Sequence, residues 1–268
     1  MLRDITLGQY YRADSLIHKL DARLKLIATF IFMISLFCFQ GMIGYAIAAL
    51  FLFFVIKLSK IPLGHMVKGL KAIMMLMLIT VVFQVFFTTG TVICRIGIFT
   101  ITKEGIKGAV FISFRLIFLI LGSSIMTYTT MPNQLTDAIE AVLKPLKYVK
   151  VPVHDIAMMM SIALRFIPIL VEETDKIMKA QLARGADFEN GNLLKRAKSM
   201  MPVFIPLFIS AFKRADDLAV AMEARCYNGS GGRTKMYPLK YKRRDRIAYG
   251  ILGVYFAAII VIPRVIPF

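Results

Sequence analysis

Long apolar runs alternate with basic segments along the chain. No charged residue lies between Leu26 and Ile56, and one helix of that length would run about 46 Å against a hydrocarbon core of about 30 Å. Gln40 and Gly41 lie at the middle of this run, so the pattern predicts two short spans joined by a tight turn. Lys and Arg flank the pair on both sides, which places both ends of the hairpin on the inner face of the membrane.

Three further spans are predicted, at about residues 72–87, 108–130 and 247–263. Residues 97–102, between the third and fourth spans, alternate in polarity enough to form a short strand or an ordered outer loop. Pro132 marks the inner end of the fourth span. The chain is therefore expected to be an all-α membrane protein with about five transmembrane helices, its N-terminus inside and its C-terminus outside.

The middle segment, residues 131–246, holds 20 of the 34 Lys and Arg and 12 of the 16 Asp and Glu. Its apolar blocks, Ile156 to Leu164 and Met200 to Phe212, are short for spans and suit buried or interfacial helices. We expect a cytoplasmic helical coupling domain here, pressed against the membrane. The predicted division is a membrane part at 1–130, this domain, and a last transmembrane helix at 247–268.

Composition supports a membrane protein, since 58% of the residues are hydrophobic and the mean hydropathy is +0.69. The net charge of +18 is compatible with nucleic-acid binding, but it accompanies uncharged runs of 20 residues and more. Basic inner loops beside anionic lipid explain both features, so membrane lipid is the expected partner and nucleic acid is not. The N-terminus stays polar to Arg23, so no cleavable signal is expected and the first apolar segment should remain in the protein.

The cysteines and histidines are too dispersed to suggest a metal site or a disulfide framework. They are Cys38, Cys94, Cys226, His18, His65 and His154.

Two stretches of the middle segment resemble each other, Asp175 to Gly185 and Asp216 to Cys226. In both, an arginine follows the first aspartate by nine residues, and alanines stand four and one residues before that arginine. A Phe-Ile-Pro sequence precedes each stretch. The pattern indicates a weak internal repeat of a long helix.

The arginines of this repeat, Arg184 and Arg225, are expected near helix ends, because Gly185 follows the first and Asn228-Gly229 follows the second. A cation there could simply complement the helix dipole, for about 0.3 to 1 kcal/mol. Small neighbours would instead let a partner's surface close around the guanidinium. The candidate docking residues are Ala183, Arg184, Gly185, Ala224, Arg225 and Cys226.

Four segments together make most of the chain similar to a known family. They are Tyr11 to Lys25, Pro145-Leu146 with Val151-Pro152, Ser161 to Pro168, and Ala180 to Phe188. With them, the chain resembles the transmembrane coupling subunit of energy-coupling-factor (ECF) transporters, of the EcfT/CbiQ type. Arg184 fits the family's Ala-Arg-Gly motif fully, whereas Cys226 stands where the second motif would have glycine.

The resemblance implies a scaffold in the plasma membrane that links a small substrate-binding membrane subunit to two ABC-type ATPases. ATP and Mg would be bound by the ATPases, this chain would bind no cofactor and would not be an enzyme, and both arginine motifs would seat in grooves on the ATPases. The absence of a GxxxxGK[ST] run agrees with ATP hydrolysis on another chain. The family's substrates are micronutrients, usually vitamins and otherwise transition-metal ions.

Methionines on the same apolar helices could form an adaptable docking face for the substrate-binding subunit, although methionine is also ordinary filler of apolar helices. They are Met158, Met159, Met160, Met178, Met200 and Met201.

Arg115, inside the fourth span, is a functional candidate by its position, or it could snorkel outward toward the membrane surface. The alternative function is a stand-alone secondary transporter, which would place paired polar groups at mid-membrane, where these spans are nearly bare. A membrane-embedded enzyme ranks third, because the acidic residues are scattered among basic ones.

Overall fold

The computed structural model describes residues 10–39, 41–96, 99–188, 192–227, 229 and 239–265. It consists mostly of helices, which confirms the predicted all-α fold class. The chain forms two compact units. The first contains residues 8–138 and 239–268, and the second contains residues 139–238.

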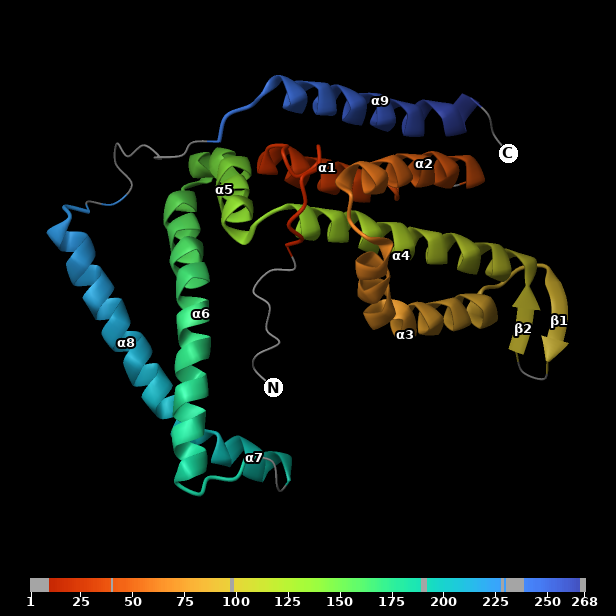
Figure 1. Cartoon of the computed structure of the whole chain (residues 1–268). Coiled ribbons are helices and arrows are strands. Elements are labelled where there is room, and N and C mark those ends of the chain that lie inside the picture. Colours follow the sequence, from red (N-terminus) through yellow and green to blue (C-terminus); the bar gives the residue numbers. More distant parts are fainter. Residues whose placement is uncertain are drawn as a thin grey trace. The chain divides into compact units, whose positions relative to one another are not determined.

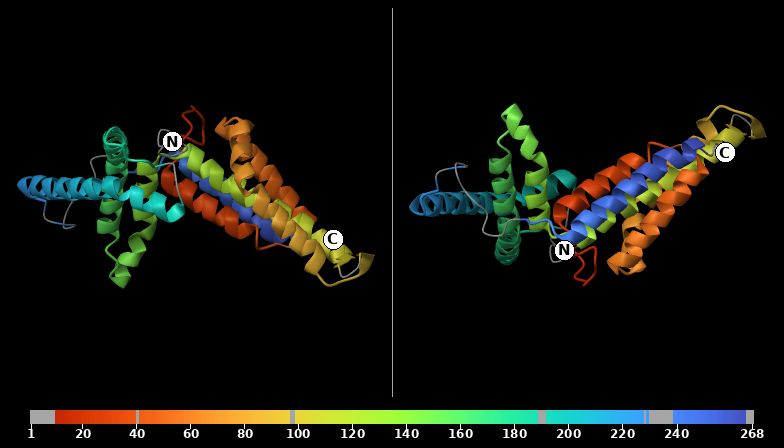
Figure 2. Two further views of the ribbon diagram at one scale, coloured as in Figure 1. Left: turned by 90° about the horizontal axis from the view of Figure 1, so that it is seen from below. Right: turned by 90° about the horizontal axis from the view of Figure 1, so that it is seen from above.

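Four helices of the first unit lie side by side in both views of Figure 2, and a further helix and a two-stranded hairpin complete the unit. The four are α1 (Ala22–Ser35), α2 (Met42–Ser59), α4 (Lys103–Thr129) and α9 (Arg243–Val265). The others are α3 (Leu63–Phe87), which packs along α4, and strands β1 (Val92–Ile96) and β2 (Phe99–Thr102) (Figure 1).

Aromatic side chains pack the core of the first unit. The rings of Phe51 and Tyr255 stack with centroids 4.1 Å apart, and Phe32 lies against both. The Tyr255 hydroxyl is 2.9 Å from the hydroxyl of Ser35, which satisfies two polar groups in a buried setting. Gly122 allows this packing, since a Cβ there would lie 2.7 Å from the Phe32 ring. The core therefore joins α1, α2, α4 and α9.

The predicted break in the first apolar run is confirmed. Helix α1 ends at Ser35 and α2 begins at Met42, with Gly41 at its N-cap. Gly41 has a φ of 149°, a conformation that residues with a Cβ rarely adopt. Gln40, the other residue of the predicted turn, lies outside the described residues.

The predicted count of five spans is not confirmed. Within the described residues, four helices are long and apolar enough to cross a membrane: α2, α4, α9 and also α6 (Val153–Ala183), which the sequence analysis did not count. Of the other two predicted spans, α1 has 14 residues and reaches only about 21 Å, whereas α3 has 25 residues and reaches about 37 Å.

The strand alternative for residues 97–102 is confirmed over Phe99–Thr102, which pairs antiparallel with β1. Residues 97 and 98 lie outside the described residues. Thr102 ends β2 and caps α4, because its hydroxyl accepts a hydrogen bond from the Gly105 N–H.

Residues around the start of α1 tie the helix ends of the first unit together. The Lys25 amine donates to the carbonyls of His18 (3.2 Å) and Thr129 (2.8 Å). The buried carboxylate of Asp245 accepts from the Asp21 N–H at 2.9 Å. These residues of the Tyr11 to Lys25 segment are therefore structural, joining α1 to the ends of α4 and α9.

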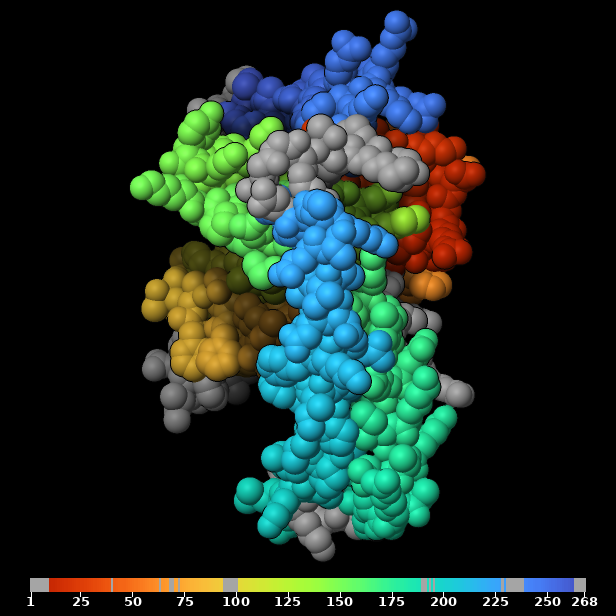
Figure 3. Space-filling view, turned by 90° about the vertical axis from the view of Figure 1, so that its left-hand side faces the viewer, coloured from red at the N-terminus to blue at the C-terminus, as the bar shows by residue number. Residues whose placement is uncertain are grey.

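The second unit is built around α6 and α8 (Met201–Ala224), which pack against each other, as Figure 3 shows for one face. The sequence left short buried or interfacial helices open for their apolar blocks, and the short buried alternative is wrong. Helix α6 continues through Pro168 and α8 through Pro206, and the only side chains that either helix buries are those of Val153, Ala157 and Val203. Their apolar side chains are mostly left for another surface to cover.

The remaining elements are short. The second unit also contains the 3-10 helix η2 (Lys144–Val149) and α7 (Leu193–Ser199), and α5 (Pro132–Leu143) contains the boundary between the units. Helix α5 begins at Pro132, where the sequence pattern places the end of the fourth span.

Candidate functional site: two arginine-bearing helix ends

The end of α6 has the geometry of a Schellman motif. The helix ends at Ala183, and Arg184 is its C-cap residue. The Gly185 N–H donates to the Leu182 carbonyl, and the Ala186 N–H reaches back to the Gln181 carbonyl, each at 3.0 Å. Gly185 has a φ of 86°, so the chain turns sharply directly after the arginine.

The end of α8 repeats this geometry. The helix ends at Ala224, with Arg225 as its C-cap residue. The Cys226 N–H donates to the Glu223 carbonyl, and the Tyr227 N–H donates to the Met222 carbonyl, each at 2.9 Å. The two weakly similar sequence stretches therefore fold into the same local structure, with the arginine at the same position in each.

The two ends differ in the residue that turns left-handed. Cys226 has a φ of 56° and occupies the position that Gly185 occupies after α6. The sequence predicts the second break at Asn228-Gly229, but the left-handed turn lies two residues earlier, at Cys226. A residue with a Cβ costs about 1 kcal/mol or more in this conformation. The end of α8 therefore adopts the same backbone conformation as the end of α6 despite the cost at Cys226.

The six candidate docking residues are all exposed. Between described residues, neither the Arg184 nor the Arg225 guanidinium forms a hydrogen bond or an ion pair. Ala183 and Ala224 directly precede the arginines and add little bulk. Each end thus presents a planar cation with small neighbours, a form that suits carboxylates and carbonyls in a protein groove.

The two arginines lie at opposite ends of the helix pair. The Gln181 amide donates to the Pro202 carbonyl at 3.3 Å, which places the end of α6 beside the start of α8. The Tyr227 hydroxyl lies 2.9 Å from the Met158 sulfur, which places the end of α8 beside the start of α6. Along α6, 26 residues separate Met158 from Arg184, a helix length of about 39 Å. Two separate partner surfaces can therefore be engaged at once.

A polar contact joins the two helices between these ends. The Glu173 carboxylate of α6 accepts hydrogen bonds from the Ser210 hydroxyl (2.6 Å) and the Arg214 guanidinium (2.7 Å), both on α8. Ser210 and Arg214 are four residues apart and so lie on one face of α8. Charge-assisted bonds of this kind fix the register of one helix against the other.

The methionines of the predicted docking face divide by exposure. Met159, Met160 and Met201 are exposed, whereas Met158, Met178 and Met200 are half-buried.

A larger apolar surface on α8 was not predicted from the sequence. It consists of Phe204, Ile205, Phe208, Ile209 and Phe212, each more than half exposed. Their spacing of one, three and four residues is that of one helix face, so the helical period could have identified them. Figure 3 shows α8 along one side of the helix pair. We name these five residues the α8 ridge.

No group of three or more His, Cys, Asp or Glu that could hold a metal ion occurs within the described ranges. His18 and His154 have protein partners instead. The His18 ring bonds the Ser15 hydroxyl and the Tyr11 carbonyl, and the His154 ring bonds Glu140.

Comparison with known proteins identifies relatives over nearly the whole chain. The family model described as "Cobalt transport protein" (CbiQ) matches residues 13–237. The chain is 52% identical over 265 residues to the energy-coupling factor transporter transmembrane protein EcfT of Ruminiclostridium cellulolyticum, covering 99% of each chain. It is 50% identical to the EcfT of Clostridium kluyveri, covering 92% of this chain and 93% of the relative, and 46% identical to that of Bacillus subtilis, covering 91% and 93%. The chain therefore belongs to the CbiQ cobalt transport protein family and is a multi-pass transmembrane protein of the energy-coupling factor transporter type.

Proposed function

We propose that this chain is the transmembrane scaffold of an ECF-type ABC importer and that Arg184 and Arg225 each anchor one ATPase subunit. The observation that carries the proposal is the repeat of one capped helix end, with an exposed arginine, at both ends of an antiparallel helix pair. Two like anchors suit two like partners. The chain itself is not an enzyme in this proposal, since ATP and Mg are bound by the ATPases.

The antiparallel arrangement also bears on how the pair meets the membrane. If α6 crossed the bilayer with α8 beside it, Arg184 and Arg225 would lie on opposite sides of the membrane. Two ATPases on one side can reach both arginines only if the pair lies along the membrane surface. Although α6 is long and apolar enough for a span, we place the pair along the cytoplasmic face. As the flanking lysines and arginines predict, we place the N-terminus in the cytoplasm and the C-terminus outside.

Coupling follows from the stiffness of the pair. ATP-driven closing of the two ATPases would move their grooves, and with them the two arginine ends. Because Glu173 joins α6 to α8 between those ends, a movement at either end is transmitted through the pair. The arginines act as anchors and take no part in bond-breaking.

The uncovered apolar side chains of the pair are proposed to meet the small substrate-binding membrane subunit. The predicted methionine face supplies Met159, Met160 and Met201, and the α8 ridge adds aromatic and aliphatic area beside them. That subunit would select the micronutrient, a vitamin or a transition-metal ion, so this chain need not carry a substrate site. Crosslinks from these positions that never reach such a subunit would contradict this assignment.

The test of ATPase anchoring is affinity purification of the tagged chain from mild detergent, with the stoichiometry of co-purifying proteins measured. The wild-type chain is expected to retain two ATPase subunits, and Arg184→Glu/Arg225→Glu to lose both, because a buried charged anchor is replaced by its opposite. Lys176→Glu/Lys213→Glu is the matched control, since both lysines are exposed on the same helices away from the ends. Normal stoichiometry in the arginine variant would refute the proposal.

A further inference from the structure

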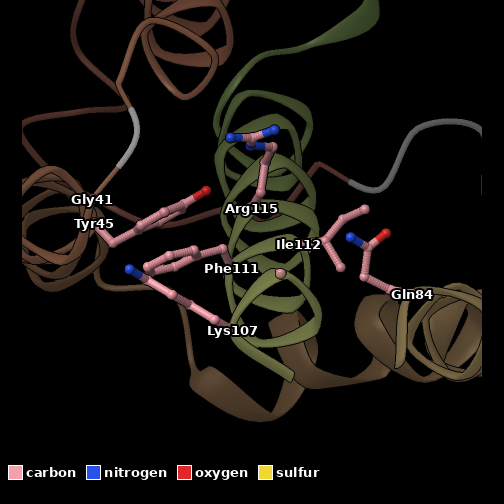
Figure 4. Close-up of a pocket in the computed structure, with 8 residues that line it drawn as sticks. Gly41, Tyr45, Gln84, Lys107, Phe111, Ile112 and Arg115 are labelled. Carbon is pink, nitrogen blue, oxygen red and sulfur yellow. The ribbon is translucent and has the colours of Figure 1, made fainter. Parts of the chain in front are cut away.

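A pocket of about 600 Å³ with both polar and apolar lining residues opens in the first unit between α2, α3 and α4 (Figure 4). It lies apart from both arginine-bearing ends in sequence, and the proposed coupling function makes no use of it. Its lining side chains carry two positive charges, from Lys107 and Arg115, and no carboxylate among the residues identified. The nearest acidic residue in sequence, Glu104, accepts hydrogen bonds from the Thr91 N–H (2.7 Å) and hydroxyl (2.9 Å).

The two cations lie on one row of α4. Lys107, Phe111 and Arg115 are spaced by four residues, so they follow one another along the same helix face. Arg115 is half-buried and its guanidinium lies 5.1 Å from the centre of the Phe37 ring. Its Nε atom is buried and has no hydrogen-bond partner among the described residues. Arg115 therefore does not snorkel away from the protein but is held over the pocket with donor capacity unused.

A second, independent donor faces the same space. Tyr45 is only 5% exposed, its ring stacks on Phe111 with centroids 5.3 Å apart, and its hydroxyl is buried without a partner among the described residues. Figure 4 shows this hydroxyl pointing toward the Arg115 guanidinium. A buried hydroxyl with no acceptor is destabilising. A bound ligand that accepts a hydrogen bond from this hydroxyl would remove that cost.

Gln84 brings a further polar group to the pocket from α3. A Cβ on Gly108 would lie 2.7 Å from the Gln84 side-chain nitrogen, so glycine at this position allows the amide to approach α4 closely. The pocket is thus assembled from donors on three different helices.

We propose that this pocket binds the phosphate group of an anionic phospholipid. Lys107 and Arg115 supply positive charge, and the Tyr45 hydroxyl and Gln84 amide supply neutral donors to the phosphate oxygens. The apolar side chains of Phe37, just after α1, and of Val110 and Phe114, on α4, are exposed and offer a surface for acyl chains. These exposed apolar side chains favour a lipid over a free anion, because a free anion has no acyl chain to pack against them.

The position along α4 gives the site a definite depth. Lys107 lies about 6 Å and Arg115 about 18 Å from the start of the helix. A phosphate held by both side chains would lie deeper than the usual head-group plane. Local thinning of the bilayer, which is one response to a charge inside a membrane, would then be centred on α4.

The experiment is native mass spectrometry of the full-length chain in mild detergent, titrated with phosphatidylglycerol, phosphatidylcholine or inorganic phosphate. We expect the wild type to bind one phosphatidylglycerol more tightly than phosphatidylcholine, and Lys107→Gln/Arg115→Gln to weaken that binding by about tenfold or more. Lys57→Gln/Lys60→Gln is the matched control, because these exposed lysines flank α2 at its other end. An equal loss in both double variants would overturn the proposal in favour of general surface attraction.

Tyr45→Phe removes one oxygen and keeps the ring, so it separates binding from folding. The thermal unfolding temperature should stay the same or rise, since the hydroxyl has no partner among the described residues, while phosphatidylglycerol binding should weaken by about threefold to tenfold. Unchanged lipid binding in Tyr45→Phe would overturn the proposal. Inorganic phosphate that displaces the lipid at equal concentration would also overturn it, because the site would then be one for small anions.

Discussion

The ends of α6 and α8 share a backbone but differ in the residue that makes the turn. Both arginines are C-cap residues, and both are followed by the same pair of reverse hydrogen bonds. Gly185 adopts the left-handed conformation readily, whereas Cys226 adopts it at a cost. A conformation maintained with an unfavourable residue indicates that the shape matters at the second end as much as at the first. The departure of Cys226 from the family motif is therefore a change of residue without a change of local fold.

The largest expected effect comes from removing one anchor at a time. Arg184→Ala and Arg225→Ala should each weaken ATPase attachment by about 2 to 5 kcal/mol, because truncation leaves the partner's buried groups unpaired. The equal geometry of the two ends predicts losses of similar size, each affecting one of the two ATPases. Binding of purified ATPase to immobilised chain would measure both. A loss confined to one variant would show that the structural likeness of the ends does not extend to function.

A smaller effect is expected from exchanging the residues that make the turn. Cys226→Gly should stabilise the chain by about 1 kcal/mol, and Gly185→Cys should destabilise it by about the same amount. Thermal unfolding in one detergent would compare the two with the wild type. Both variants keep the arginines, so ATPase binding should persist in each. If Cys226→Gly were destabilising, the thiol would have a role that the backbone geometry does not explain.

Sequence patterns predicted most helix boundaries, because residues at or next to each boundary determine where the helix ends. The uncharged run was too long for one span, and Gly41 lies at its break. The repeat placed both arginines at helix ends, where the structure has them. The α8 ridge follows the helical period equally well, so the sequence pattern contains it too.

Other features depend on contacts that a sequence does not display. Pro168 removes a backbone donor from α6, and only packing decides whether such a helix continues or stops. Cys226 is an unfavourable choice for a left-handed turn, so residue preference placed the break two residues late. The pocket around Arg115 draws on three helices that are distant along the chain, and spacing alone could not bring Tyr45 and Gln84 to it.

The most direct test of the account is photocrosslinking from each helix end in native membranes. A photoactivatable maleimide would be placed on the exposed Cys226 in one variant, and on Ala186→Cys with Cys226→Ser in another, both in a background with Cys38 and Cys94 replaced by serine. The account predicts that each position gives an adduct with an ATPase subunit, because both ends face the cytoplasm and each seats in a groove. An adduct from only one end, or labelling of the two ends from opposite sides of the membrane, would contradict it.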